Sequence, residues 1–155
     1  MYNKESKPKK FRNFYGRLKG KGLRELQQKL LNDQLEKLSI PAVSYDINPD
    51  RKLIELSDLF KNVTSFSLEI GFGGGEHLVY QAERNPNIGF IGCEPYINGV
   101  AMLAGKLSKT ELTNVRIHPG DVRDLFDVLP DDSIDSVDLL YPDPWPKKRH
   151  HRRRF

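Results

Sequence analysis

An aspartate between two prolines, beside a tryptophan and a dense group of cations, is the arrangement in this chain best suited to chemistry. Tyr141-Pro142-Asp143-Pro144-Trp145 is followed closely by the basic stretch 147–154. A proline fixes its own φ and favours an extended residue before it, so Tyr141 and Asp143 are expected on a stiff, extended backbone. A fixed carboxylate and a large ring near many cations suit chemistry on a nucleic-acid base. By itself, the pattern describes a strand exit with a solvated basic tail equally well.

The composition bounds the class of protein. The chain has 155 residues, of which 37% are apolar and 30% charged, as expected for a single folded domain. It contains no apolar run approaching the roughly 20 residues that span a bilayer, and its basic N-terminus lacks the apolar core of a secretory signal. We therefore expect a cytoplasmic protein without a membrane partner. Cys93 is the only cysteine, which excludes an internal disulfide and a cysteine-cluster zinc site, and no metal is expected.

The charges are distributed unevenly along the chain. Residues 1–24 carry nine Lys or Arg and one acid, and residues 143–155 carry six and one. The residues between them carry ten Lys or Arg and nineteen acids. Basic segments on an acidic body favour a polyphosphate partner, with an anionic membrane surface as the competing interpretation. Phe11, Phe14 and Tyr15 lie among the first cations and could stack on unpaired bases, which favours RNA.

Leucines at helical spacing predict an amphipathic helix over residues 23–38, which we expect to pack against the domain that follows. Pro41 ends that pattern, and residues 41–64 indicate an irregular connector with a helical turn near 56–60. The sequence therefore divides into a basic arm (1–22), a helix with its connector (23–64) and a ligand-binding domain (65–155).

Strands and helices alternate regularly from residue 65. This order predicts an α/β fold with a doubly wound parallel sheet, whose ligands bind beyond the carboxyl ends of the strands. Glu94, Asp121 and Asp143 all fall at or just after such ends. The expected strands are 65–70, 88–93, 114–118 and 134–141, and the expected helices are 76–85, 97–107 and 123–129.

A glycine-rich turn, Gly71-Phe72-Gly73-Gly74-Gly75, follows the first strand and opens a helix. Such a turn lets a nucleotide-like ligand approach the backbone closely. A dinucleotide such as NAD would place its pyrophosphate near Glu69 and Glu76, where like charges repel. S-adenosylmethionine carries an ammonium and a sulfonium, which the same acids stabilise. The turn therefore favours S-adenosylmethionine.

Two further acids are placed to bind a nucleoside. Glu94 ends the second strand about twenty residues after the glycines, where a carboxylate can accept both ribose hydroxyls of either cofactor. Asp121 follows the third strand, where it can accept from an adenine amino group or cap a helix. Phe90 and Cys93 are expected in the core.

These motifs together resemble the bacterial tRNA (guanine-N7-)-methyltransferase family. The resemblance rests on Glu69-Ile70-Gly71-Phe72-Gly73, Gly92-Cys93-Glu94, Gly120-Asp121 and, above all, the specific run from Pro142 to His150. It covers about residue 66 to the last residue and extends more weakly into the N-terminal arm. It implies a Rossmann-like sheet of class I methyltransferase type, S-adenosylmethionine as the cofactor and a guanine in the tRNA variable loop as the substrate.

The resemblance also implies roles for individual residues. Glu69, Glu94, Asp121 and Asp143 would line the S-adenosylmethionine site with the glycine turn at Gly71 and Gly73. Asp143 would also be the catalytic residue and contact the substrate. Lys147 matches a family position that contacts the tRNA.

Chains of this family normally continue well beyond the tryptophan motif, whereas nothing follows Phe155 here. We therefore expect the C-terminal strands to be missing, the last strand to be an unpaired edge, and the site to be truncated or completed by a second copy. Three other interpretations stay open: methylation of an exocyclic base amine, methylation of a protein amide, and an RNA-binding fragment without catalysis.

Overall fold

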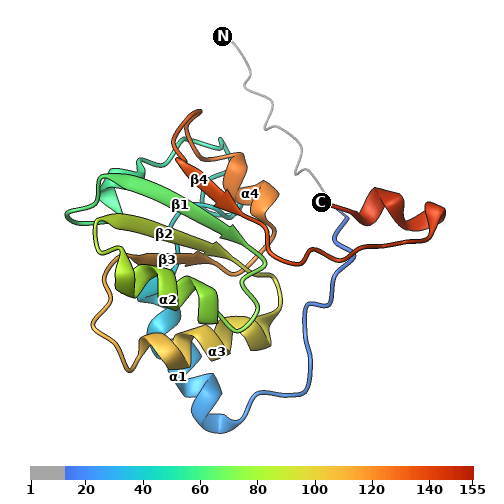
Figure 1. The fold of residues 1–155 in the computed structure, drawn as a ribbon, viewed down its shortest axis with the longest axis horizontal. Coiled ribbons are helices and arrows are strands. Elements are labelled where there is room, and N and C mark those ends of the chain that lie inside the picture. The colour runs from blue at the N-terminus through green and yellow to red at the C-terminus, as the bar shows by residue number, and fades with distance from the viewer. Residues whose placement is uncertain (1–12) are drawn as a thin grey trace.

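Four parallel strands form the centre of the fold in the computed structural model, which describes residues 13–155 (Figure 1). The first part of the predicted basic arm, residues 1–12 with Phe11, lies outside the described residues. The strands lie in the order β3-β2-β1-β4. Their bounds are β1 Ser65–Ile70, β2 Ile88–Cys93, β3 Val115–His118 and β4 Ser136–Asp138.

Both faces of the sheet are covered. Helices α1 (Glu25–Leu38), α2 (Glu76–Arg84) and α3 (Ile97–Leu107) pack on one face, and their apolar side chains share a core with Phe90, Val115 and Ile117 (Figure 1). On the other face, the connector after α1 and helix α4 (Val122–Phe126) surround a second core. Alternate residues of a strand point to opposite faces, so Phe90 joins the first core while Ile91 and Cys93 join the second.

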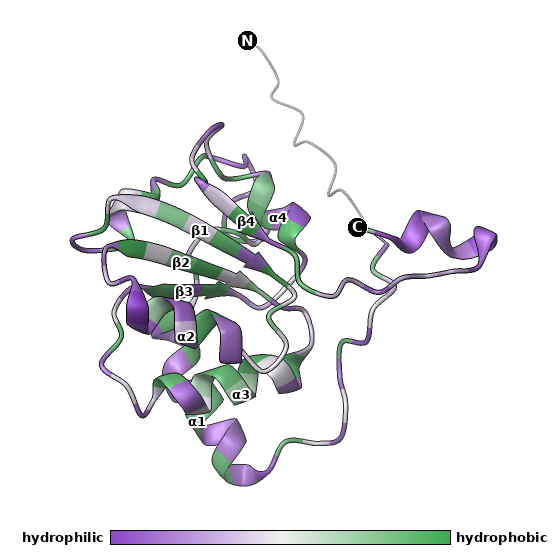
Figure 2. Cartoon of the chain, in the orientation of Figure 1, coloured by the Kyte–Doolittle hydropathy of each residue, from purple (hydrophilic) through white to green (hydrophobic). Residues whose placement is uncertain are grey.

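The predicted α/β class and the doubly wound parallel sheet are confirmed. Strands β1 and β2 and helix α3 have the predicted bounds, and α2, β3 and α4 differ from them by one to three residues at an end. The amphipathic helix packs as expected, because Leu31 and Leu38 of α1 are buried against α3 and β3. Figure 2 shows apolar residues along the strands and α3, in contrast to the hydrophilic helix η2 (Lys148–Arg153).

The predicted length of the last strand is wrong. We expected a strand over 134–141, but β4 spans only Ser136–Asp138 and pairs with β1 alone. Within the described residues β4 is an edge strand, as predicted, with Val137 55% exposed. The backbone groups of a strand are fully paired only when it has a neighbour on each side, and the described chain gives β4 a neighbour on one side. Beyond β4 the chain leaves the sheet and runs to η2 (Figure 1).

The extended backbone expected before Pro142 is also wrong. Tyr141 has a φ of 51° and Trp145, which also precedes a proline, has a φ of 39°. Both values lie in the left-handed region, which L-residues with large side chains rarely adopt. The chain turns at these two positions as it leaves the sheet, so the local preference before proline is overridden.

Helix α3 approaches the glycine turn through Gly99. A Cβ at this position would lie 2.3 Å from the carbonyl oxygen of Gly73, which is backbone and cannot rotate away. Gly105 lies on the same helix, and a Cβ there would meet no atom within 4 Å. The close contact at Gly99 therefore positions the turn relative to α3.

We expect Gly99→Ala to lower the free energy of unfolding by about 1–3 kcal/mol, because α3 must move away from the turn. Gly105→Ala is the matched control and should raise it by about 0.5–1 kcal/mol through helix propensity alone. Urea denaturation of the two variants measures the difference. Equal changes in both variants would show that the turn tolerates a displaced α3.

Candidate functional site

The glycine turn connects β1 to α2 through three left-handed residues. Gly71, Gly73 and Gly75 have φ values of 73°, 57° and 79°. No atom lies within 4 Å of a Cβ built on Gly71 or Gly73, so the backbone there is open to a ligand. At Gly75, packing excludes a larger residue, because a Cβ would lie 2.6 Å from the Leu103 side chain on α3.

Glu94 holds the turn in place from the end of β2. The side chain of this buried residue accepts from the N–H of Gly73 through Oε2 at 2.8 Å and from the N–H of Tyr96 through Oε1 at 2.9 Å. Each carboxylate oxygen has a second lone pair, so both oxygens can still accept from a ligand. The bonds to two backbone groups fix the side chain before any ligand arrives.

Glu69 lies at the end of β1, next to the start of the turn. Its side chain is 6% exposed, and His77 Nδ1 lies 3.0 Å from Oε2. Burial raises the pKa of the Glu69 carboxyl above its ordinary value, and the negative charge of Asp138 adds to that rise. His77 acts in the opposite direction through its hydrogen bond.

Asp121 caps helix α4, which was one of the two uses predicted for it. Its Oδ1 accepts from the N–H of Arg123 at 2.9 Å, and both carboxylate oxygens accept from the Arg123 guanidinium. This ion pair raises the pKa of the Arg123 guanidinium. Arg123 also donates to the carbonyl of Asn13 at 3.1 Å, which connects α4 to the N-terminal arm.

The loop that carries Asp143 is held by the basic residues that follow it. Arg154 donates from Nε to the carbonyl of Pro144 at 3.0 Å and from a terminal nitrogen to that of Trp145 at 3.3 Å. The Trp145 ring packs edge-on against His150, with centroids 5.6 Å apart. Asp143 itself is exposed. Arg154 therefore holds the loop that carries Asp143.

A cavity of about 780 Å³ lies beyond the carboxyl ends of the strands. It lies at the ends of the neighbouring strands β1 and β4, between which the strand order of the sheet reverses. Of the predicted site residues, Gly71, Glu94, Asp121 and Asp143 line it together. Glu69, Gly73 and Lys147 are not among its lining residues. Glu69 is buried at the end of β1 beside His77, Gly73 contacts the cavity residue Glu94, and Lys147 is the exposed residue just before η2.

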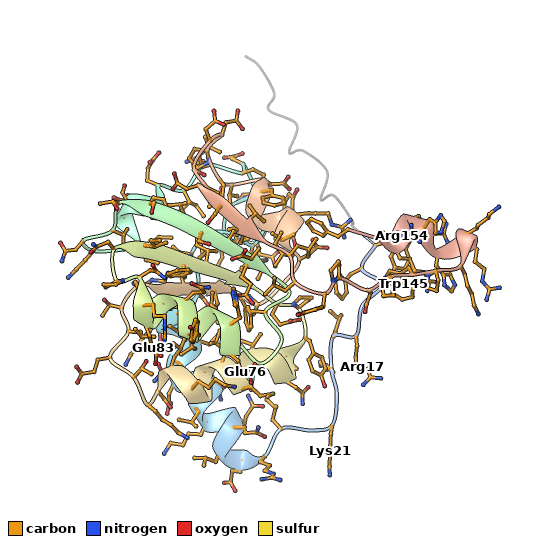
Figure 3. The ribbon with its side chains drawn as sticks, in the orientation of Figure 1. Arg17, Lys21, Glu76, Glu83, Trp145 and Arg154 are labelled. Atoms are coloured by element: carbon orange, nitrogen blue, oxygen red, sulfur yellow. The ribbon has the colours of Figure 1, made fainter. Side chains whose placement is uncertain are left out.

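The two basic ends of the described chain also line this cavity. The guanidinium of Arg153 lies 5.1 Å from the ring centre of Tyr15 and 5.0 Å from that of Trp145. Figure 3 shows Arg17 and Lys21 on the N-terminal arm, on the same side of the molecule as Trp145 and Arg154. The sequence predicts that the aromatic residues of the arm stack on unpaired bases. No sequence signal pointed to Arg123, Tyr96 or a contact between the two ends.

Asn98 at the start of α3 fixes the arm where it crosses this helix. Its Oδ1 accepts from the N–H of Gly20 at 2.9 Å, and its Nδ2 donates to the carbonyl of Lys21 at 2.7 Å. A third bond joins the N–H of Ile97 to the carbonyl of Leu18 at 3.0 Å. The arm from residue 13 onward is therefore bound to the body of the protein beside the cavity.

Residues 13–155 contain neither a candidate metal site nor a helix able to cross a membrane. No group of three or more His, Cys, Asp or Glu side chains there is arranged to hold a metal ion. In the same part of the chain, every helix is too short or too polar to cross a membrane.

Residues 64–155 match a family model described as "Putative methyltransferase". A curated tRNA (guanine-N(7)-)-methyltransferase of Roseobacter denitrificans is 58% identical over 153 residues, which cover 99% of this chain and 64% of the relative. A protein of the same name from Ruegeria pomeroyi is 62% identical over 144 residues, covering 93% of this chain and 60% of the relative. One from Agrobacterium fabrum is 48% identical, with 92% and 59% covered. The chain thus spans about three fifths of the length of these relatives.

The raised pKa of Glu69 predicts a pH-dependent cost in stability. Because the pKa is higher in the folded state, the ionised carboxylate destabilises the protein above that pKa, and the cost disappears as the pH falls below the unfolded value. We expect Glu69→Gln to be more stable than the wild type at pH 8, with a difference that shrinks towards pH 4. Chemical denaturation across this range measures it.

Glu83→Gln, at an exposed position of α2, is the matched control and should show no such trend. A Glu69→Gln variant that is less stable than the wild type at pH 8 would show that the partners of the carboxylate outweigh its burial.

Proposed function

This chain belongs to the methyltransferase family whose model it matches, and we propose that it transfers a methyl group from S-adenosylmethionine to N7 of a guanine in tRNA. The observation that carries this proposal is that Glu94, Asp121, Asp143 and Trp145 line one and the same cavity. Relatives that share this part of the chain are named tRNA (guanine-N(7)-)-methyltransferases.

The cavity fits S-adenosylmethionine better than a dinucleotide. Its volume lies within the roughly 300–1,000 Å³ of small-molecule pockets. A pyrophosphate needs free backbone N–H groups at the turn, but the N–H of Gly73 already donates to the Glu94 carboxylate. The acids Glu69 and Glu94 at this end of the sheet repel phosphate and attract cations. When bound, S-adenosylmethionine supplies a methyl group attached to a positively charged sulfur.

Three acids besides Asp143 divide the proposed contacts with the cofactor. Glu94, already fixed by two backbone N–H groups, accepts from the ribose hydroxyls through its remaining lone pairs. Asp121 lies on the cavity wall as the acceptor for the adenine amino group, although Arg123 competes for its oxygens. We assign Glu69, which is buried at the end of β1 next to the turn, to the ammonium group. The open backbone at Gly71 and Gly73 allows the methionine part to lie close to the chain.

Asp143 is the residue that we propose to act on the base. The N7 atom of guanine has a lone pair and no proton, so its methylation requires positioning rather than a strong base. The ring becomes positively charged as the bond forms, and a nearby carboxylate stabilises that charge. Asp143 lines the cavity on a loop that Arg154 holds in place, so it can hydrogen-bond the guanine edge and stabilise the cationic product.

The basic segments supply the proposed contacts with tRNA. Lys147, Lys148 and Arg149 extend from the Asp143 loop, and Arg17 and Lys21 lie on the arm at the same side of the molecule (Figure 3). Phosphates attract such cations regardless of sequence. We propose that the chain divides by role into the RNA-contacting arm (1–22), the helix and connector (23–64) and the cofactor domain (65–155).

The reaction is tested by incubating the protein with methyl-labelled S-adenosylmethionine and an unmodified tRNA transcript, then identifying the labelled nucleoside. We expect 7-methylguanosine. Asp143→Ala should abolish transfer and largely spare tRNA affinity, whereas Asp131→Ala, an exposed acid before β4, should leave both unchanged.

A different labelled nucleoside would keep the methyltransferase activity and reject the guanine-N7 assignment. Binding of tRNA without any label would indicate an RNA-binding fragment. Equal loss of transfer and tRNA affinity in Asp143→Ala would reject Asp143 as the catalytic residue.

Contact between Lys147 and a tRNA phosphate predicts a change in salt dependence. Lys147→Ala should weaken tRNA binding at low salt and reduce the slope of log K against log salt concentration by about 1. Lys61→Ala, an exposed lysine at the opposite end of β1, should preserve the slope. Filter binding over a salt series measures both variants. An unchanged slope in Lys147→Ala would remove this lysine from the interface.

A further inference from the structure

A row of polar side chains on helix α2 ends at the buried Glu69 carboxylate. His77 and Gln81 are four residues apart on one face of the helix, and Asn85 follows four residues later as the C-cap, just beyond the last helical residue. Asn85 Nδ2 lies 3.3 Å from Gln81 Oε1, Gln81 Nε2 lies 3.2 Å from His77 Nε2, and His77 Nδ1 lies 3.0 Å from Glu69 Oε2. The contacts form one continuous chain of hydrogen bonds.

The direction of these bonds is determined at the Asn85 end. Asn85 Nδ2 also donates to the backbone carbonyl of Gln81 at 2.9 Å, and a carbonyl can only accept, so the amide nitrogen must point this way. The side-chain atom of Gln81 that faces Asn85 is then its oxygen, and the amide nitrogen of Gln81 faces His77.

The same logic determines the proton of His77. An amide NH₂ has no acceptor capacity, so Nε2 of His77 must accept from Gln81 and carry no proton. The proton therefore lies on Nδ1, which donates to the carboxylate of Glu69. In this arrangement the ring donates to Glu69 without adding a positive charge.

The position of Glu69 shows why a neutral donor matters. In the sheet register Glu69 is paired with Asp138 of β4 and with Gly92 of β2. Side chains of paired residues point to the same face, so the described neighbours on the two adjacent strands offer Glu69 a second acid and no side-chain donor. The donor comes instead from His77 on α2. A protonated histidine or a lysine at this position would cancel the charge that attracts a cation.

We propose that His77 is a positioning residue, which orients the Glu69 carboxylate toward the ammonium group of the cofactor, and that Gln81 keeps His77 in the neutral Nδ1–H form required for this role. The bond to Oε2 restricts rotation of the carboxylate and leaves Oε1 for the ligand. The inference rests on the proposed cofactor site, because it takes Glu69 as a ligand of S-adenosylmethionine.

Three substitutions test the geometry. His77→Asn places an amide N–H close to the position of Nδ1, so affinity for S-adenosylmethionine in titration calorimetry should fall less than threefold. His77→Leu removes the donor, and we expect a loss of roughly tenfold. Gln81→Glu is isosteric but favours a protonated His77, and we expect a loss of roughly fivefold that a merely structural Gln81 would not cause.

The state of His77 is measured without cofactor by ¹⁵N NMR of the imidazole. The wild type should show a neutral ring with a protonated Nδ1 at pH 7.5, and Gln81→Glu should show a ring protonated on both nitrogens. A wild-type ring protonated on Nε2, or a charged one, would overturn the proposal. Urea denaturation shows whether each variant is folded. If His77→Leu does not fold, the two single variants His77→Asn and Gln81→Glu still test the role of His77.

Glu69→Gln separates this inference from the proposed function. If Glu69 binds the ammonium, Glu69→Gln strongly lowers the affinity for S-adenosylmethionine. Adding His77→Leu to that variant then causes little further loss of affinity. If Glu69→Gln binds S-adenosylmethionine weakly but His77→Leu binds it with wild-type affinity, the role of His77 is overturned and that of Glu69 is kept. Wild-type affinity in Glu69→Gln would remove Glu69 from the proposed cofactor site and overturn the inference with it.

Discussion

The Glu94 carboxylate is the connection on which the cavity depends. It accepts from the N–H of Gly73 on one side and from that of Tyr96 on the other, so it joins the glycine turn to the segment that begins α3. Gly99 allows the helix to approach the same turn closely. A ligand therefore meets a carboxylate and a backbone that are already ordered, and binding costs less conformational entropy. The bond from Gly73 to Glu94 also occupies a backbone N–H that a bound phosphate would need.

The parts of the fold that could be predicted are those with local signals. The apolar runs at 65–70 and 88–93 and the glycines between them determine β1, the turn and β2 with little help from the rest of the chain. The end of β4 was predicted wrongly because strand length depends on the neighbours available for pairing. Tyr141 shows a second limit, since its left-handed backbone opposes the local preference before Pro142.

The candidate site divides in the same way. Glu94, Asp121 and Asp143 could be placed from sequence because parallel strands bring their carboxyl ends to one edge of the sheet. The competition of Arg123 for Asp121 could not be predicted, because a single exposed arginine carries no pattern. The contact of Tyr15 with Arg153 also has no local signal, since it joins segments from opposite ends of the described chain.

That last contact has a consequence for how the protein is made. Tyr15 and Arg153 are 138 positions apart, so at roughly 5–20 residues per second the ribosome needs roughly 7–28 s to synthesise the second after the first. Until Arg153 has been added the cationic arm cannot make this contact, although α3 can bind the arm through Asn98 once that helix has been synthesised. The wall of the cavity that unites both segments therefore forms only after Arg153 has been added, later in synthesis than the glycine turn and the four strands.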